Sequence, residues 1–148
     1  MNATHRIPER TPTPAGGPTP RGLLTSGVDL VSIPRIERVL ARYGDRFLAR
    51  IYTPQEIARS RGRSATLAAR FAAKEATAKA LGVGMRLMSP GGIGWLEVET
   101  LNEPSGKPYL VLHGRAAALA KAQELTLWSV SLSHDAGIAV AFVVAAGP

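Results

Sequence analysis

Apolar and β-branched residues form a short run at 24–31, which predicts a strand. Ser32 is a favourable helix N-cap and Pro34 is tolerated in a first helical turn, so a helix is expected to follow directly. Gly44 can end that helix in a left-handed conformation. The apolar residues expected on its buried face are Ile33, Ile36, Leu40 and Tyr43.

A second helix is predicted from Thr53, because Thr53 and Glu56 form a capping box with Pro54 at the first helical position. Arg61-Gly62 interrupts the pattern. Alanine then dominates up to Leu81, and Gly82 is placed where a left-handed cap belongs. We therefore expect a long central helix that starts near residue 64 or 66.

The second half of the chain reads mainly as strand. Residues 95–101 alternate between apolar and polar, 102–108 are dense in turn formers, and 109–113 are again strand-like, which predicts an antiparallel pair. Residues 115–124 form an alanine-rich segment that favours helix.

The chain ends in a second predicted strand pair. Residues 127–133 alternate strictly, 134–137 favour a turn, and 138–145 form an apolar strand. The face that carries Trp128, Val130 and Leu132 is expected to be the buried one. Helices early and strands late indicate an α+β fold with a mainly antiparallel sheet packed on the long central helix.

Residues 1–22 differ from the rest in being rich in proline and glycine and nearly free of apolar side chains. Such a segment cannot bury enough surface to offset its ordering entropy, so it is predicted to be a flexible extension. Residues 23–148 are then expected to form one domain, since 148 residues with 45% hydrophobic content suffice for a single core.

The chain is strongly basic, with a net charge of +7, so its partners are expected to be anionic: nucleic acid, a phosphorylated cofactor or an acidic protein. The absence of cysteine excludes thiolate chemistry and disulfides, and suits a reducing cytoplasm. No apolar stretch is long enough for a membrane span or has the form of a signal peptide. We therefore expect a cytoplasmic protein that does not contact membranes.

Two acids are candidates for chemistry. Asp29 lies among apolar residues of the first strand, where a carboxylate is costly to bury unless it is paired or metal-bound; a hydrogen bond to a helix N-terminus would also explain it. Glu75 lies on the central helix among Arg70, Lys74 and Lys79, and a simple i,i+4 pair with Lys79 is the alternative there. Together, two hard oxygen ligands and several cations suit Mg²⁺ and phosphate.

His134 follows the strand at 127–133 and is the candidate for a neutral-pH proton carrier or a phosphate donor, although a structural histidine would explain it too. Between residues 35 and 50 the chain carries five arginines with little acidic balance. A solvated polar face is one explanation for them, and a docking surface for an acidic helix, with Phe47 as an apolar contact, is the other. They are Arg35, Arg38, Arg42, Arg46 and Arg50.

These segments together resemble the holo-acyl-carrier-protein synthase family, the small class of phosphopantetheinyl transferases. The resemblance covers nearly everything after the extension, and its central motif is highly specific. The matching segments are Gly27-Val28-Asp29-Leu30 with Arg35, Arg70-Phe71-Ala72-Ala73-Lys74-Glu75-Ala76 with Lys79-Ala80-Leu81-Gly82, Gly106-Lys107-Pro108, and Val130-Ser131-Leu132-Ser133-His134.

The resemblance implies transfer of the 4′-phosphopantetheine arm of coenzyme A to a serine of an apo acyl carrier protein, in support of fatty acid or polyketide synthesis. It also implies a homotrimer with active sites between subunits. Its expected site residues are as follows: Asp29 and Glu75 as Mg²⁺ ligands; Asp29, Glu75 and Lys79 in catalysis; Arg70, Lys74, Lys79, Gly82 and His134 at coenzyme A; and Arg35, Arg42, Arg46 and Phe47 at the carrier protein.

Two details qualify the match. The spacing from Arg35 to Arg46 is one residue longer than the family pattern. Val31 stands where the larger, monomeric transferases carry a further acid, which favours the small trimeric class and leaves coordination positions for water or substrate. The proton of the attacking serine is expected to pass either to a metal-oriented water or to Glu75.

Two other classes of function were weighed against transfer. A non-catalytic, basic nucleic-acid-binding module explains the net charge but leaves Asp29 and Glu75 without a role. A scaffold that binds a carrier protein without catalysis does not require the complete set of Asp29, Glu75 and Lys79. The sequence does not indicate whether the recipient is a free carrier protein or a domain of a large synthase.

Overall fold

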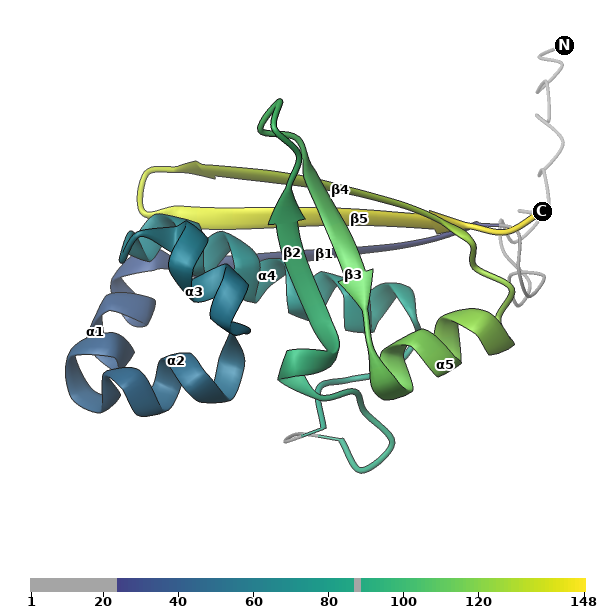
Figure 1. The fold of residues 1–148 in the computed structure, drawn as a ribbon, viewed down its shortest axis with the longest axis horizontal. Coiled ribbons are helices and arrows are strands. Elements are labelled where there is room, and N and C mark those ends of the chain that lie inside the picture. Colours follow the sequence, from purple (N-terminus) through teal and green to yellow (C-terminus); the bar gives the residue numbers. More distant parts are fainter. Residues whose placement is uncertain (1–23, 87–88) are drawn as a thin grey trace, which may run out of the picture.

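The structure, a computed structural model, describes residues 24–86 and 89–148. The extension predicted for residues 1–22 lies outside the described residues, so that prediction stands untested. The elements, labelled in Figure 1, are β1 (Leu24–Ser32), α1 (Ile33–Tyr43), α2 (Asp45–Ile51), α3 (Pro54–Ser60), α4 (Ser64–Ala80), the 3₁₀ turn η1 (Trp95–Glu97), β2 (Val98–Asn102), β3 (Pro108–Leu112), α5 (Gly114–Ala122), β4 (Leu127–Asp135) and β5 (Ile138–Ala146).

β1, β5 and β4 form an antiparallel sheet in that order, so β1 and β4 are its two edges. β2 and β3 form a separate antiparallel hairpin. β4 and β5 are joined by Ala136 and Gly137, both with positive φ, as a tight hairpin turn requires. The turn is shorter than predicted because β4 continues through His134 to Asp135.

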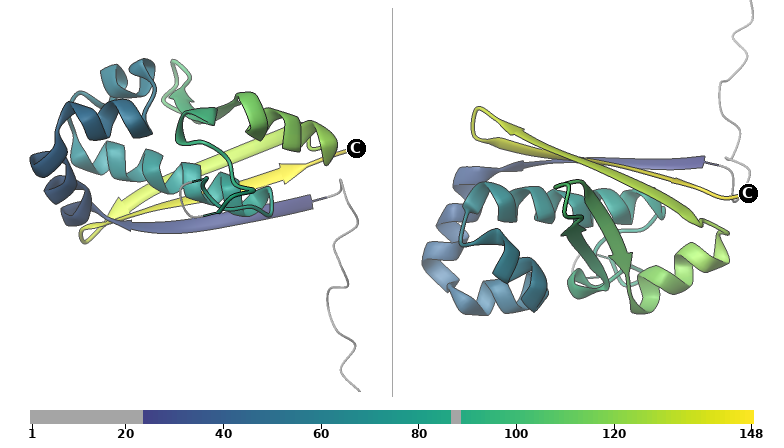
Figure 2. Two further views of the ribbon diagram at one scale, coloured as in Figure 1. Left: turned by 90° about the horizontal axis from the view of Figure 1, so that it is seen from below. Right: turned by 45° about the horizontal axis from the view of Figure 1, so that its top comes forward.

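The central helix α4 lies between two layers. The three-stranded sheet covers one side of it, and the β2–β3 hairpin with α5 lies on the other, while α1, α2 and α3 gather at one end (Figures 1 and 2). α4 is accordingly buried along most of its length. The opposite face of the sheet carries no other described element (Figure 2). The α+β architecture with a mainly antiparallel sheet on a long central helix is confirmed.

Very small residues let α4 approach the sheet closely. The helix presents Ala72, Ala73 and Ala76, all fully buried, toward strands that carry Gly27 and Ala141. A methyl group on Gly27 would overlap the carbonyl oxygen of Ala76. The backbones of β1 and α4 are therefore closer here than any residue other than glycine permits.

The predicted helix boundaries are confirmed where they depended on capping chemistry. The Ser32 hydroxyl accepts a hydrogen bond from the Arg35 amide at 3.4 Å. Thr53 and Glu56 form the reciprocal capping box at the start of α3. Gly82 has φ +73°, the left-handed conformation expected just after α4.

Three segments differ from prediction. The helix α2 was not anticipated, because seven residues make only about two helical turns, too few to show a helical period. α5 ends at Ala122 rather than residue 124, where Glu124 has a positive φ. Residues 95–97 form a 3₁₀ turn rather than strand, because the Glu97 carboxylate accepts hydrogen bonds from the amides of Gly94 (2.7 Å) and Arg115 (3.2 Å).

Replacing Glu97 by Gln should lower stability at neutral pH and have less effect in acid. Burial alone would raise the pKa of Glu97, but the two amides and Arg86 lower it below its ordinary range. A carboxyl whose pKa is lower in the folded state than in the unfolded state stabilises the fold at pH values above its unfolded-state pKa, which is about 4.3. This stabilisation is lost as the pH falls through the folded-state pKa.

Urea unfolding at pH 7 and pH 3 checks this prediction. The free-energy difference between wild type and Glu97→Gln should be larger at pH 7. Glu124→Gln, at an exposed position beyond α5, is the matched control and should show little difference at either pH. An equal destabilisation by Glu97→Gln at both pH values would contradict the assignment.

Candidate active site

Three of the predicted site residues meet where β1 faces α4. The Lys79 ammonium donates to the Asp29 carboxylate and to the Val28 carbonyl, each at 2.9 Å. Glu75 precedes Lys79 by four residues and therefore lies on the same face of α4. The pairing of Lys79 with Asp29 across the two elements brings the two candidate acids and one cation into a single polar corner.

The Glu75 carboxyl lies in an environment that disfavours its negative charge. Partial burial raises its pKa first, the charge of Asp29 raises it further, and Lys79 opposes both. Two neighbouring carboxylates with a single lysine leave excess negative charge at this corner. The corner therefore suits an additional cation.

This corner opens onto a cavity of about 560 Å³. Asp29, Glu75 and Lys79 form its polar end, and Arg35 and Arg50 also reach it from α1 and α2. The remaining wall is largely apolar and comes from β1, α1, α2, α4 and η1: Leu30, Val31, Ser32, Ile36, Val39, Phe47, Ile51, Phe71 and Trp95. No sequence pattern indicates that Phe71 and Trp95, whose ring centroids are 4.7 Å apart, line this site.

The basic residues of the central motif lie on a different side of α4. An α-helix turns by about 100° per residue, so Arg70 and Lys74 are about 140° and 100° from Glu75. Their contacts agree with this geometry, because both side chains bond to β2 whereas Lys79 bonds to β1. The predicted site residues therefore form two separate groups within one chain.

Lys74 was expected at coenzyme A, but its position calls for a different role. The side chain is fully buried, and its ammonium donates to Glu56 (2.8 Å), to the Trp95 carbonyl (3.1 Å) and to the Val98 carbonyl. These three bonds use all its donors. A cofactor could be bound by Lys74 only if this buried set were broken, so we treat Lys74 as a structural residue.

Arg70 is also buried and supports a surface groove. It donates to the Thr100 carbonyl (3.2 Å) and to the Asn102 side chain (2.9 Å). Asn102 lines an exposed groove of about 470 Å³ with Ala58 and three arginines. The arginines are Arg59, Arg61 and Arg63. The alternation of arginine with small residues in Arg59-Ser60-Arg61-Gly62-Arg63 is the sequence signal that indicates this groove.

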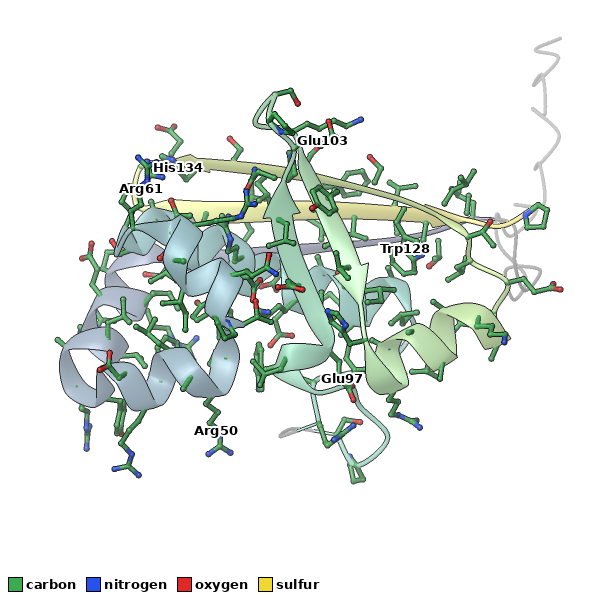
Figure 3. All side chains as sticks on the ribbon, viewed as in Figure 1. Arg50, Arg61, Glu97, Glu103, Trp128 and His134 are labelled. Atoms are coloured by element: carbon green, nitrogen blue, oxygen red, sulfur yellow. The ribbon has the colours of Figure 1, made fainter. Side chains whose placement is uncertain are left out.

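His134 is exposed on β4, one edge of the sheet, whereas Asp29 lies on β1, the other edge. In Figure 3 the His134 and Arg61 side chains both lie toward the end of the molecule that carries α1 and α3. Gly82 ends α4 and does not line the cavity. Within one chain, His134 and Asp29 are therefore separated by the width of the sheet.

The predicted docking residues lie on α1 and α2. Arg35, Arg42 and Arg46 are exposed, and the Arg42 guanidinium stacks on Tyr43 at 5.2 Å. Arg50, labelled in Figure 3, lies on α2 and lines the cavity together with Arg35. Phe47 is partly buried, packs edge-on against Tyr52 and lines the cavity, so it joins the basic surface to the site.

Comparison with known proteins assigns this arrangement to a class. Residues 26–143 match the family model described as the 4'-phosphopantetheinyl transferase superfamily. The chain is 47% identical over 127 residues to the holo-[acyl-carrier-protein] synthase of Herpetosiphon aurantiacus, covering 84% of this chain and 100% of that protein. It is 48% identical over 128 residues to the one from Solidesulfovibrio magneticus, covering 86% and 98%.

A solved structure agrees. The crystal structure of Helicobacter pylori holo-[acyl-carrier-protein] synthase in complex with coenzyme A matches with a TM-score of 0.72 and 35% identity, covering 82% of this chain and 99% of that one. The chain therefore belongs to the 4'-phosphopantetheinyl transferase superfamily and, within it, to the holo-[acyl-carrier-protein] synthase family, as its motifs predicted. Within the described residues, no helix is both long and apolar enough to cross a bilayer.

Proposed function

We propose that the chain transfers the 4′-phosphopantetheine arm of coenzyme A to a serine of an apo acyl carrier protein, with Mg²⁺ at Asp29 and Glu75. The observation that carries the proposal is the cavity that holds Asp29, Glu75 and Lys79 at one end. Family membership supports the reaction, and the cavity supports its location. A nucleic-acid-binding module would have no use for two acids in a basic protein.

The residues present fit Mg²⁺. Burial and then the charge of Asp29 raise the pKa of Glu75, so a cation beside the two carboxylates would stabilise the charged form of Glu75. Among the described residues no three potential His, Cys, Asp or Glu ligands cluster, and Mg²⁺ commonly takes only one or two protein carboxylates, with water and substrate phosphates completing its shell. When bound, the metal would supply charge neutralisation at the pyrophosphate.

The serine hydroxyl oxygen forms a bond to the β-phosphorus of coenzyme A, and the bond from that phosphorus to the bridging oxygen breaks. Adenosine 3′,5′-bisphosphate leaves with the electron pair. The Lys79 ammonium, held beside Asp29, can donate to the leaving phosphate. The serine proton passes to Glu75 or to a water beside it.

The phosphates of coenzyme A require cations beyond Lys79. The groove of Arg59, Arg61 and Arg63, with Asn102 braced by Arg70, supplies them, and His134 adds a further donor at the same end of the molecule. In this proposal Arg70 contributes by holding the groove in place. Gly82 contributes by ending α4 just after Lys79.

In a trimer with sites between subunits, the acids at the cavity of one subunit would meet the arginine groove of a neighbouring subunit. The uncovered face of the sheet exposes large apolar side chains that no described residue covers, a pattern typical of protein interfaces. They are Leu24 (58%), Val28 (51%), Leu30 (67%), Leu127 (67%), Ile138 (42%) and Phe142 (47%). Assembly through this face would cover them and place the arginine groove of one subunit near Asp29 and Glu75 of the next.

The carrier protein is proposed to dock on α1 and α2, where Arg35, Arg42, Arg46 and Phe47 adjoin the cavity. A free carrier protein and a carrier domain of a large synthase both fit this surface, since only a local acidic surface is required. The cytoplasm stays the predicted compartment, on the basis of the cysteine-free sequence. Fatty acid or polyketide synthesis is the process that the modified carrier protein would serve.

Arg42→Glu should raise the KM for the carrier protein roughly tenfold, because it places a negative charge against an acidic partner. The KM for coenzyme A and kcat should change little, since Arg42 does not line the cavity. Steady-state kinetics with each substrate varied in turn separates these effects. Lys121→Glu, an equal charge change at an exposed position on α5, is the control. Equal effects of both variants would contradict a docking surface on α1.

Incubation of the protein with apo acyl carrier protein, coenzyme A and Mg²⁺ tests the function itself. The carrier protein should gain the mass of one phosphopantetheine arm, and replacement of Mg²⁺ by a chelator should prevent the gain. Absence of any mass gain, with coenzyme A and a folded carrier protein present, would overturn the proposal.

A further inference from the structure

The buried pair Glu56–Lys74 joins α4 to the elements around it. Neither side chain has any exposed surface, and their charged atoms are 2.8 Å apart. Glu56 also accepts from the amides of Thr53 and Thr100, each at 3.0 Å. Through these two residues α4 is bonded to the start of α3, to β2 and to η1.

Stability alone does not account for such a pair. Removing two charges from water costs several kcal/mol each, and replacing a buried pair by apolar residues is often neutral or stabilising. The pKa of Lys74 is lowered chiefly by burial, which shows this cost, while Glu56 opposes the shift. A specific geometrical task would explain why this site uses two charges instead of two apolar side chains.

The position of the pair indicates the task. Lys74 directly precedes Glu75, and the carbonyl that it holds on η1 belongs to Trp95, which lines the cavity. Phe71, on the same helix as Glu75, stacks on the Trp95 ring. The bonds of Lys74 therefore fix the rotation of α4 and the opposite cavity wall together.

We propose that Glu56 and Lys74 are positioning residues for phosphopantetheine transfer. They hold Glu75 and Trp95 at a fixed separation and orientation across the cavity. The inference rests on the proposed function. A side chain tip lies about 5–6 Å from a helix axis, so a rotation of about 10° moves it by ~1 Å. A displacement of that size at a reacting centre costs up to roughly 10²-fold in rate.

The test is the double variant Glu56→Gln with Lys74→Met, which removes both charges and nearly conserves volume. Its thermal unfolding midpoint should fall moderately, because the Trp95 and Val98 carbonyls lose a donor and the glutamine nitrogen faces a backbone amide. The variant should still fold, because no unpaired buried charge remains. Its kcat should fall by at least roughly tenfold, whereas the KM for coenzyme A should change little, since the arginine groove is untouched. In a Trp128→Phe background, Trp95 is the single tryptophan, and its fluorescence should shift in the double variant.

Thr77→Val is the matched control on the same helix. Its buried hydroxyl bonds only to the Ala73 carbonyl, so the variant perturbs α4 without changing any contact to η1 or β2. It should keep wild-type kcat and Trp95 fluorescence even if its midpoint falls.

A folded double variant with wild-type kcat and unchanged Trp95 fluorescence overturns the positioning role. If the double variant does not fold, Glu56→Asp decides: it keeps the charge but is one methylene shorter, and wild-type kcat in that variant overturns the role as well. Failure of the wild-type chain to modify a carrier protein is a separate result, which overturns the proposed function.

Discussion

Glu75→Gln should lower kcat by roughly 10³-fold or more and leave the chain folded. The substitution keeps the size of the side chain but removes one of the two proposed metal ligands and the group that can accept the serine proton. Loss of a single preorganised electrostatic contact at a reacting centre commonly costs 10²- to 10³-fold, and this variant loses two functions at once. Mass spectrometry of the carrier protein after timed incubation measures the rate.

The same variant should be no less stable than wild type when Mg²⁺ is absent. The folded-state pKa of Glu75 is raised, mainly by burial and then by Asp29, so ionising it costs the folded state free energy. Wild type accordingly loses stability as pH rises from the unfolded pKa through the folded one, and Gln removes that loss. Unfolding midpoints at pH 7.5 with a chelator test this. Undiminished product would contradict the role of Glu75, and a large drop in the midpoint would indicate a structural role instead.

Leu127→Asp should convert the proposed trimer into monomers and reduce transfer by more than roughly 10²-fold. Leu127 is 67% exposed on the uncovered sheet face and does not line the cavity. A carboxylate there costs the separated chain little, whereas burying it in an interface is strongly unfavourable. Sedimentation velocity gives the assembly state, and the mass-gain assay gives activity. Tyr109→Asp, at an exposed position on β3, is the control and should keep the assembly state and activity of wild type. A fully active Leu127→Asp monomer would contradict shared sites.

Subunit mixing tests the sharing directly. Glu75→Gln disables the pair of acids on one side of the proposed shared site. His134→Glu repels phosphate on the other side, near the arginine groove. Each variant alone should therefore be inactive. In mixed trimers one interface combines the intact Glu75 of one chain with the intact His134 of its neighbour, so activity should return after the chains are unfolded and refolded together. No recovery from trimers shown to be mixed would place both groups in one chain's own site.

The parts of the fold that depend on local chemistry were predictable from sequence. The caps at Ser32, Thr53 and Gly82 depend on side chains or backbone freedom within a few residues, and the structure confirms all three. The alternation of Trp128, Val130 and Leu132 likewise identified the buried face of β4. The short helix α2 and the turn at Glu97 were missed because tertiary contacts decide their conformation.

The site was predictable as a set of residues but not as an arrangement. The motif around Glu75 placed acids and cations together in sequence, yet helical geometry separates Arg70 and Lys74 from Glu75 and Lys79. The partner that fixes the role of Lys74 is Glu56, 18 residues away, and no spacing rule connects the two. Only the packing of α3 and β2 on α4 reveals that Lys74 is buried.

The close approach of β1 to α4 at Gly27 has a consequence for how the two acids are tuned. Asp29 is two residues beyond Gly27, and Glu75 is next to Ala76, whose carbonyl leaves no room for a side chain on Gly27. The separation between the two carboxylates thus depends on the short distance between the backbones of β1 and α4 at Gly27 and Ala76. Gly27→Ala would widen this separation. At the proposed Mg²⁺ site, selectivity between cations of different radius would then depend on residues that bind no ion.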